Sequence, residues 1–120
     1  MKVAVTSRGP EPDSEIDPRF GRAKYFIIFD RETDEVVALD NTQNLNALQG
    51  AGIQAARNVI DAGAKALITG NVGPKAFATL KAGGVEVCLG ADGTVRDMVE
   101  QYEAGRLRSV DKPSVTGHWV

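Results

Sequence analysis

The chain has 120 residues, of which 42% are hydrophobic and 25% are charged, and its formal net charge is −2. These values are typical of one globular domain and argue against a disordered or fibrous protein. Because acidic and basic residues are mixed along the chain, we expect no nucleic acid as a partner. The single cysteine excludes an internal disulfide framework and a metal site built from several thiolates.

The apolar stretches of the sequence are short. The run at the N-terminus is too short for a signal peptide, and no stretch approaches the roughly 20 residues that a membrane span needs. Together with the single cysteine, these features predict a cytoplasmic protein that has no membrane partner.

The first half of the chain predicts a strand, a long loop and a hairpin. Residues 3–5 are apolar and are typical of a buried strand. Residues 7–18 contain three prolines and four acidic residues, which predicts an irregular, solvent-exposed loop. Residues 25–29 and 36–39 flank a polar turn and predict the two strands of a hairpin.

The second half alternates helix and strand signals. Helices are predicted over 51–62, 74–82 and 94–104, and strands over 66–69 and 85–89. Thr94 is a favourable N-cap with Asp97 three residues later, and Gly105 is the predicted C-cap.

The element order β-β-β-α-β-α-β-α predicts the fold class and the domain boundary. We expect an α/β fold with a mixed five-stranded sheet of order 3-2-1-4-5, in which strand 2 is antiparallel and helices cover both faces. One domain is predicted over residues 1–108, followed by an extended or flexible tail over 109–120.

A glycine-rich loop follows the strand predicted at 66–69. If this strand pairs with the first one, the loops after both strands meet at a topological switch point, where open α/β sheets bind ligands. The loop, GNVGPK, contains Gly70, Asn71, Gly73 and Lys75. Exposed amides at a helix N-terminus and a nearby lysine suit an anion with several charges. A tight turn that serves packing alone explains the motif equally well.

A basic and aromatic turn precedes the second strand. In the stretch DPRFGRAKYF, Arg19, Phe20, Gly21 and Arg22 combine two guanidinium groups with an aromatic ring, and Arg8 follows the first strand. The guanidinium groups suit an anion, and Phe20 would shield one side of it from water. The plainer interpretation is a solvated charged turn with Phe20 in the core.

A second glycine-rich entry to a helix contains Gly50, Gly52, Ile53 and Gln54, in the stretch QGAGIQ. Two such entries that face one crevice would strengthen each other as an anion site. Taken alone, a GxG pattern before a helix often serves packing.

The sequence offers little for catalysis or direct metal ligation. Cys88 lies within a predicted strand and is better explained as a small buried apolar residue. His118 is the only histidine, and one imidazole near the C-terminus makes a poor metal site. No Ser-His-Asp or Cys-His arrangement can be assembled, and the central strands lack the carboxylates of two-metal nucleases. We therefore predict no enzymatic activity, no catalytic residue and no direct protein ligand to a metal.

Four motifs together carry a resemblance to a known family. RFGRAKYF, GAGIQAA, GNVGPKA and GTVRDMVEQYEAG occur in this order within residues 1 to about 108. The chain resembles the dinitrogenase iron-molybdenum cofactor biosynthesis family, which includes NifX and the carboxyl-terminal part of NifB. The resemblance implies a ribonuclease H-like three-layer α/β fold and a protein that binds and carries metal-sulfide clusters.

The resemblance also implies a cofactor and partners. The orange proteins of sulfate-reducing bacteria, which look like close single-domain relatives, bind a mixed molybdenum-copper sulfide cluster without covalent attachment. We therefore expect a molybdenum-containing metal-sulfide cluster, with Mo-Cu-S preferred to Fe-Mo-S, in a protein from an anaerobe. Cluster donor or acceptor proteins are the expected partners of a monomer or weak homodimer.

The site that the resemblance implies comprises residues 19–23, 50–54 and 70–75. Many relatives have a histidine where this chain has Arg19, which excludes imidazole ligation there and favours an electrostatic mode. A thiomolybdate-type cluster is a soft anion that carries its own sulfur ligands, so arginine, lysine and backbone N–H groups would suffice to bind it, with Phe20 and Ile53 as apolar contacts. The sequence thus favours a non-enzymatic carrier. The alternatives are a regulatory module of the same fold that binds a small phosphorylated or nucleotide ligand, and a hydrolase.

Overall fold

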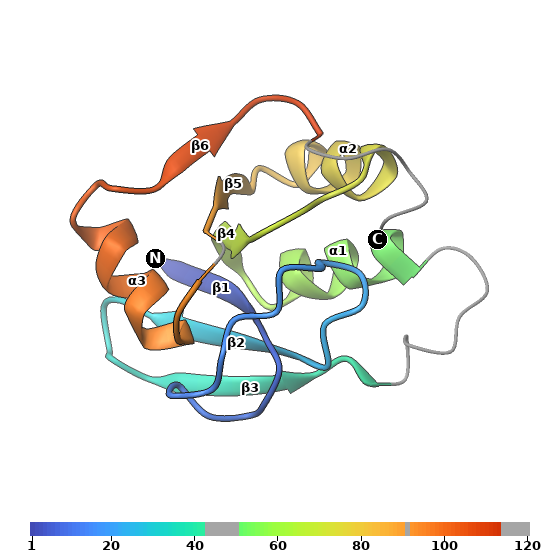
Figure 1. Ribbon diagram of the computed structural model, residues 1–120. Helices are drawn as coiled ribbons and strands as arrows, with labels where there is room; N and C mark the ends of the chain where they lie inside the picture. Colours follow the sequence, from blue (N-terminus) through green and yellow to red (C-terminus); the bar gives the residue numbers. More distant parts are fainter. Residues whose placement is uncertain (43–50, 91, 114–120) are drawn as a thin grey trace.

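The computed structural model describes residues 1–42, 51–90 and 92–113. Within these residues, six strands form one sheet and three helices cover its faces (Figure 1). The strands are β1 (Lys2–Ser7), β2 (Tyr25–Asp30), β3 (Val36–Asp40), β4 (Ala64–Thr69), β5 (Glu86–Leu89) and β6 (Arg108–Val110), and the helices are α1 (Ala51–Asp61), α2 (Pro74–Ala82) and α3 (Val95–Glu103).

The sheet has the order β3-β2-β1-β4-β5-β6. β1 and β4 are parallel neighbours, with Val5 opposite Ile68, and the chain runs outward from this pair in both directions. β2 is antiparallel to β1, and β5 is parallel to β4. The α/β class, the order of the first five strands and the predicted switch point between β1 and β4 are therefore confirmed.

The sheet contains six strands rather than the five that we predicted. β6 pairs antiparallel with β5, and Val110 lies opposite Val87. This strand has three residues, of which Arg108 and Ser109 are exposed and only Val110 packs on the core. A segment this short shows no hydrophobic alternation, so its sequence does not distinguish it from a tail. β6 also spans the predicted domain boundary at residue 108.

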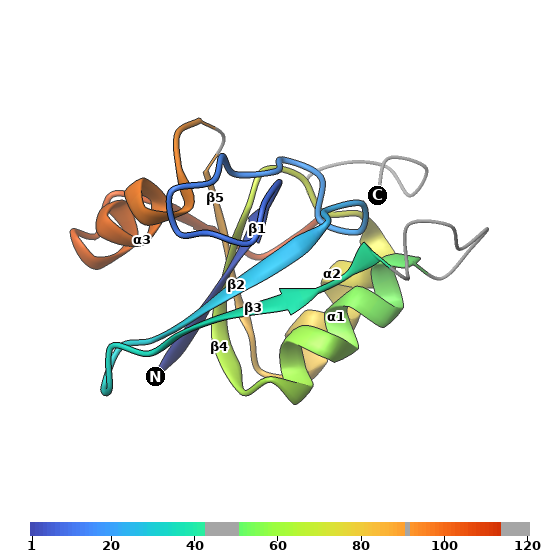
Figure 2. The same cartoon turned by 90° about the horizontal axis from the view of Figure 1, so that it is seen from below.

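Alternation along the strands builds one core on each face of the sheet. Ala4 of β1 packs toward α1 and α2, whereas its neighbours Val3 and Val5 pack toward α3. In β2, Phe26 and Ile28 alternate in the same way with Ile27. Figure 2 shows the resulting three layers, with α1 and α2 on one side of the sheet and α3 on the other.

The loop after β1 is more ordered than its sequence predicts. Ile16 and Asp17 are buried, with 3% exposure each, because the loop folds back onto β1 and onto the start of α3. Backbone N–H groups of Val95 and Arg96 donate to the carbonyls of Ser14 and Pro12 at 2.9 Å. The free amides of the first turn of α3 thus anchor the loop. Our expectation of a wholly exposed loop was wrong because these partners lie about 80 residues away in sequence.

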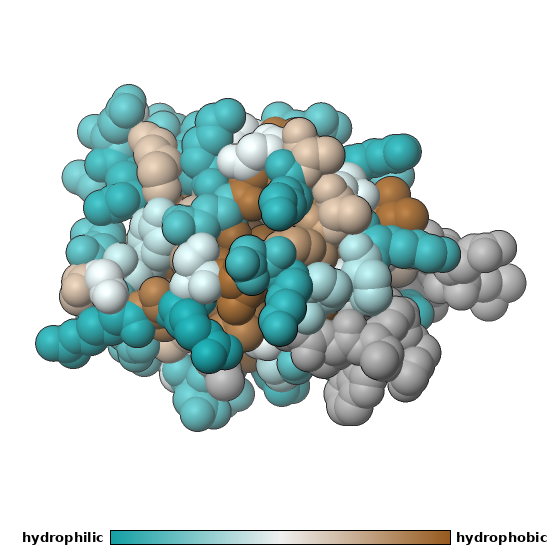
Figure 3. Space-filling model, turned by 90° about the horizontal axis from the view of Figure 1, so that it is seen from above, coloured by the Kyte–Doolittle hydropathy of each residue, from teal (hydrophilic) through white to brown (hydrophobic). Residues whose placement is uncertain are grey.

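The surface is largely hydrophilic. On the face above β6 and α2, hydrophilic residues surround a smaller central area of hydrophobic ones (Figure 3). The large hydrophobic side chains that are most exposed among the described residues are Met1, Val36 and Val37. Within the described part of the chain, no helix has the length and apolar character needed to cross a membrane.

The predicted capping box of α3 is confirmed and provides a test of its stability. The Thr94 hydroxyl accepts from the Asp97 N–H at 3.1 Å, and the Asp97 carboxylate accepts from the Thr94 N–H at 3.0 Å. We expect Thr94→Ala to lower the free energy of unfolding by about 1 kcal/mol in urea titrations, because the N-cap acceptor is lost. Thr79→Ala, which changes a half-buried threonine bonded to Lys75 O within α2, should cost less. Equal losses in the two variants would contradict a capping role.

The same box predicts an acid-dependent loss of stability. The hydrogen bonds from the Thr94 backbone N–H and hydroxyl lower the pKa of Asp97 below its ordinary value of 3.8. Because the folded state favours the ionised carboxylate, this contribution is complete above the unfolded pKa and disappears as the pH falls through the folded pKa. The difference in unfolding free energy between wild type and Asp97→Asn should therefore shrink between about pH 5 and about pH 2. A difference that stays constant over this range would contradict the assignment.

Candidate anion-binding groove

An open groove of about 510 Å³ lies where the loop after β1 meets the turn before β2. Its volume is in the range of about 300–1,000 Å³ that is common for small-molecule sites. The described residues that line it are Arg8, Asp17, Arg19, Arg22 and Lys24. Four of these five side chains are basic, although the whole chain carries a net charge of −2. The groove is therefore a local positive region that suits an anion.

Hydrogen bonds at the ends of β1 and β4 fix the backbone of Asp17, which lines the groove. The Thr6 hydroxyl donates to the Asp17 carbonyl at 2.5 Å and lies 3.0 Å from the Thr69 hydroxyl. The Asp17 N–H donates to the Thr6 carbonyl at 3.0 Å. All three residues are buried. The backbone of Asp17 is therefore tied to the central strand pair at two atoms.

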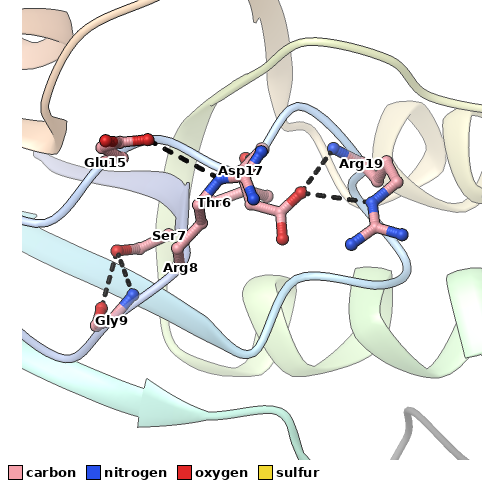
Figure 4. Close-up of polar contacts among 7 residues, drawn as sticks. All are labelled: Thr6, Ser7, Arg8, Gly9, Glu15, Asp17 and Arg19. Atoms are coloured by element: carbon pink, nitrogen blue, oxygen red, sulfur yellow. Dashed lines mark hydrogen bonds and ion pairs between the residues drawn. The ribbon is translucent and has the colours of Figure 1, made fainter.

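Two of the groove arginines have carboxylate neighbours and remain half exposed. The Asp17 carboxylate accepts from the Arg19 backbone N–H at 3.0 Å and lies 3.5 Å from Arg19 Nε (Figure 4). Arg8 Nε lies 4.0 Å from the Glu15 carboxylate. The side chains of Arg8 and Arg19 are 56% and 49% exposed, so both can meet a ligand from solution.

The GNVGPK loop lies directly beside the basic turn. The Asn71 N–H donates to the Pro18 carbonyl at 2.6 Å, and the Phe20 N–H donates to the Asn71 carbonyl at 3.2 Å. A Cβ added to Gly70 would lie 2.7–2.9 Å from atoms of Pro18, which include its backbone. The glycine is therefore explained by packing, and the amide of Asn71 supports the turn that carries Arg19.

None of the residues 70–75 of this loop lines the groove. Gly73 is buried and is the N-cap of α2, with no side-chain cap, and Pro74 follows it at the first helical position. Lys75 is exposed in the first turn, and it is not among the described residues that line the groove. The loop thus contributes mainly by positioning its neighbours.

The aromatic ring of the basic turn faces the interior. Phe20 has 0% exposure, and its ring centroid lies 5.4 Å from that of Phe26. Gly21 beside it is also buried. The interpretation of Phe20 as a core residue therefore applies, and its ring is not exposed to a ligand in the groove. The ring anchors the turn that carries Arg19, which is exposed, and Arg22, which is half-buried.

The start of α1 is explained by helix packing. A Cβ on Gly52 would lie 3.3 Å from the Cβ of Ala76, so this glycine allows α1 and α2 to approach closely. Ile53 is half-buried, and Gln54 is exposed and donates to Asn58 Oδ1 at 3.0 Å. None of these three described residues lines the groove. Gly50 and His118 lie outside the described residues.

Sequence reasoning missed two residues of the groove. Lys24 stands two positions after Arg22, and this spacing would place both side chains on one side of an extended segment. The two-residue spacing could therefore have indicated that Lys24 shares the groove with Arg22. Asp17 belongs to a run that we interpreted as exposed, and its burial depends on contacts with β1 that the local sequence does not reveal.

The single cysteine is a buried thiol in the core. Cys88 is 2% exposed in β5, and burial, followed by the nearby Glu86 carboxylate, raises the pKa of its thiol to about 11. The thiol is therefore protonated at neutral pH, whereas a metal ligand is a thiolate. Among the described residues, no group of three or more His, Cys, Asp or Glu side chains is arranged to bind a metal ion.

Comparison with known proteins identifies the family. The family model described as dinitrogenase iron-molybdenum cofactor matches residues 1–105. The chain belongs to this family. The apo form of the orange protein from Desulfovibrio gigas is similar at 39% identity, with a TM-score of 0.92 and coverage of 95% of this chain and 96% of that chain.

Two further relatives support the membership of this chain in the dinitrogenase cofactor family. A NifB-like protein from Thermotoga has 35% identity and a TM-score of 0.82, with coverage of 95% of this chain and 98% of that chain. An uncharacterized protein of Methanocaldococcus jannaschii is 26% identical over 113 residues, which are 92% of each chain. The resemblance seen in the motifs is confirmed. The family and the orange protein indicate a role in binding or carrying a cofactor during its biosynthesis, which also suggests protein partners in maturation.

The contact between Gly70 and Pro18 predicts a stability effect. We expect Gly70→Ala to lower the free energy of unfolding by about 1–3 kcal/mol, because the new methyl group would overlap the Pro18 backbone. Asn71→Ala is the matched control, since it keeps the backbone bonds to Pro18 and Phe20. Urea denaturation followed by circular dichroism measures both. A Gly70→Ala variant as stable as Asn71→Ala would show that the close approach is not required.

Proposed function

We propose that this protein binds an anionic metal-sulfide cluster as cargo in the four-cation groove and carries it without covalent attachment. The observation that carries the proposal is the set of basic side chains Arg8, Arg19, Arg22 and Lys24 around one groove at the switch point. Family membership and the similarity to the orange protein support a cofactor of this class. We favour a molybdenum-copper sulfide cluster over an iron-molybdenum one, as the resemblance to orange proteins implies.

The groove chemistry fits such cargo. Guanidinium and ammonium groups donate charge-assisted hydrogen bonds, and the sulfides of a cluster would accept them. Because the cluster already has sulfur ligands, it requires no thiolate from the chain, in keeping with the protonated thiol of Cys88. Arg8 and Arg19 are about half exposed, so the attraction is screened by water and the binding would be reversible. Reversible binding suits transfer between a donor protein and an acceptor protein.

A small phosphorylated or nucleotide ligand is the second candidate, because the same basic side chains would bind phosphate oxygens. The two candidates differ in the softness of the anion. Competition between tetrathiomolybdate and inorganic phosphate or ATP for the groove separates them.

Replacement of the groove arginines tests the proposal. Apoprotein would be incubated anaerobically with tetrathiomolybdate and Cu(I), and retained cluster would be measured after gel filtration by visible absorption and by molybdenum and acid-labile sulfide content. We expect the double variant Arg19→Ala/Arg22→Ala to bind roughly tenfold to hundredfold more weakly, because two charge-assisted donors are lost.

Two controls make the result specific. Lys65→Ala/Lys81→Ala removes the same charge from exposed positions near the start of β4 and in the last turn of α2, which do not line the groove, and should retain most of the affinity. Cys88→Ala removes the buried thiol and should also retain the cluster. The proposal fails if wild type retains no cluster, if phosphate or ATP displaces tetrathiomolybdate at equal concentration, or if Cys88→Ala loses the cluster as completely as the double arginine variant.

A further inference from the structure

We infer that Asp17 is a positioning residue, which orients Arg19 for the cargo by engaging its backbone N–H and its Nε. This inference rests on the proposed function, because it concerns the same groove. A positioning role for Asp17 would explain an unexpected feature of the groove. A carboxylate lies among four basic side chains in a groove that should attract an anion. On charge alone, Asp17 weakens anion binding there.

The position of the Asp17 carboxylate is set by the core of the fold. Its backbone N–H and carbonyl both bond to Thr6 at the end of β1, and its side chain is 4% exposed. Thr6 in turn contacts Thr69 of β4. The carboxylate therefore offers a fixed reference point at the edge of a groove whose basic side chains are otherwise long and flexible.

The carboxylate contacts Arg19 in a way that leaves part of the guanidinium for a ligand. Oδ1 lies 3.0 Å from the Arg19 backbone nitrogen and 3.5 Å from Nε. In Figure 4 both dashed lines reach this one oxygen, and none of the drawn residues is joined to the terminal nitrogens of Arg19. The planar fork of a guanidinium has five donors, so engagement of Nε leaves the terminal N–H groups to bind cargo.

Arg8 provides an internal comparison. Its carboxylate neighbour Glu15 is 79% exposed and lies 4.0 Å from Nε, so the pair is loose. The side chain of Asp17 is buried, and it also bonds to the Arg19 backbone. Ordering a flexible side chain costs about 0.5–1.5 kcal/mol on binding, which corresponds to about twofold to twelvefold in affinity. Asp17 removes part of that cost for Arg19 but not for Arg8.

A purely local role for Asp17 makes a different prediction. A carboxylate that bonds the N–H two residues later forms an Asx turn, and asparagine forms the same turn. Asp17→Asn therefore keeps the turn and removes only the charge that attracts Arg19 Nε. Loss of this charge has two opposite consequences for an anion: general attraction to the groove increases, and the orientation of Arg19 is lost.

A double-mutant cycle separates these consequences. Tetrathiomolybdate affinity would be measured anaerobically for wild type, Asp17→Asn, Arg19→Ala and the double variant. The general electrostatic gain from Asp17→Asn is present with or without Arg19, whereas the loss of orientation occurs only when Arg19 is present. We expect the effect of Asp17→Asn on affinity to be roughly threefold to tenfold less favourable with Arg19 present than in the Arg19→Ala background.

A second readout needs no cargo. In ¹⁵N NMR spectra of the apoprotein, Arg19 Nε–H should give a distinct signal that exchanges slowly with solvent. Asp17→Asn should abolish this protection from exchange. The melting temperature of the variant should stay within a few degrees of the wild-type value. If Asp17→Asn does not fold, Arg19→Lys is the alternative, because one ammonium group cannot contact Asp17 and the cargo with the same geometry. We expect it to bind roughly threefold to tenfold more weakly than wild type.

The outcomes distinguish this inference from the proposed function. Equal effects of Asp17→Asn in both backgrounds, or an unprotected Arg19 Nε–H in wild type, would overturn the positioning role. Wild type that does not bind tetrathiomolybdate would overturn the proposed cargo, and the Nε–H signal would still decide whether Asp17 orients Arg19.

Discussion

The hydrogen bonds that connect Thr6, Asp17 and Thr69 are the constraint on which the groove depends. They join the ends of the two central parallel strands to the loop after β1. β1 and β4 are neighbours at the switch point. The segment after β1, which carries Arg19, therefore begins at a position that the central strand pair holds in place. The turn that carries Arg19 is therefore supported by buried polar contacts, although the Arg19 side chain is about half exposed.

The groove combines a hydrogen-bonded base with basic side chains that are at least partly exposed. Packing of Phe20 and the bonds between Asn71 and its neighbours fix the turn, and α3 anchors the preceding loop through its first amides. The basic side chains then provide attraction without covalent ligation. A cofactor carrier benefits from this arrangement, since it has to bind its cofactor and also release it to a partner. Cys88 is buried in the core, and burial raises the pKa of its thiol to about 11.

Much of the fold was predictable from the sequence because its signals are local. Hydrophobic periodicity located the helices, and Thr94 with Asp97 located the start of α3. The paired loops at the switch point followed from strand order. The three-residue strand β6, the burial of Asp17 and the packing roles of Gly52 and Gly70 were not predictable, because each depends on a partner distant in sequence. A glycine that relieves a contact and one that exposes an amide look the same in a sequence.

The most direct test of the account is to map where a metal-sulfide anion contacts the protein. Arginine and lysine side-chain NMR signals would be followed while tetrathiomolybdate is added to ¹⁵N-labelled apoprotein under anaerobic conditions. The account predicts that the largest shifts occur at Arg8, Arg19, Arg22 and Lys24, and that Lys65 and Lys81 are unchanged. Shifts centred away from the groove, or spread evenly over all basic residues, would contradict it.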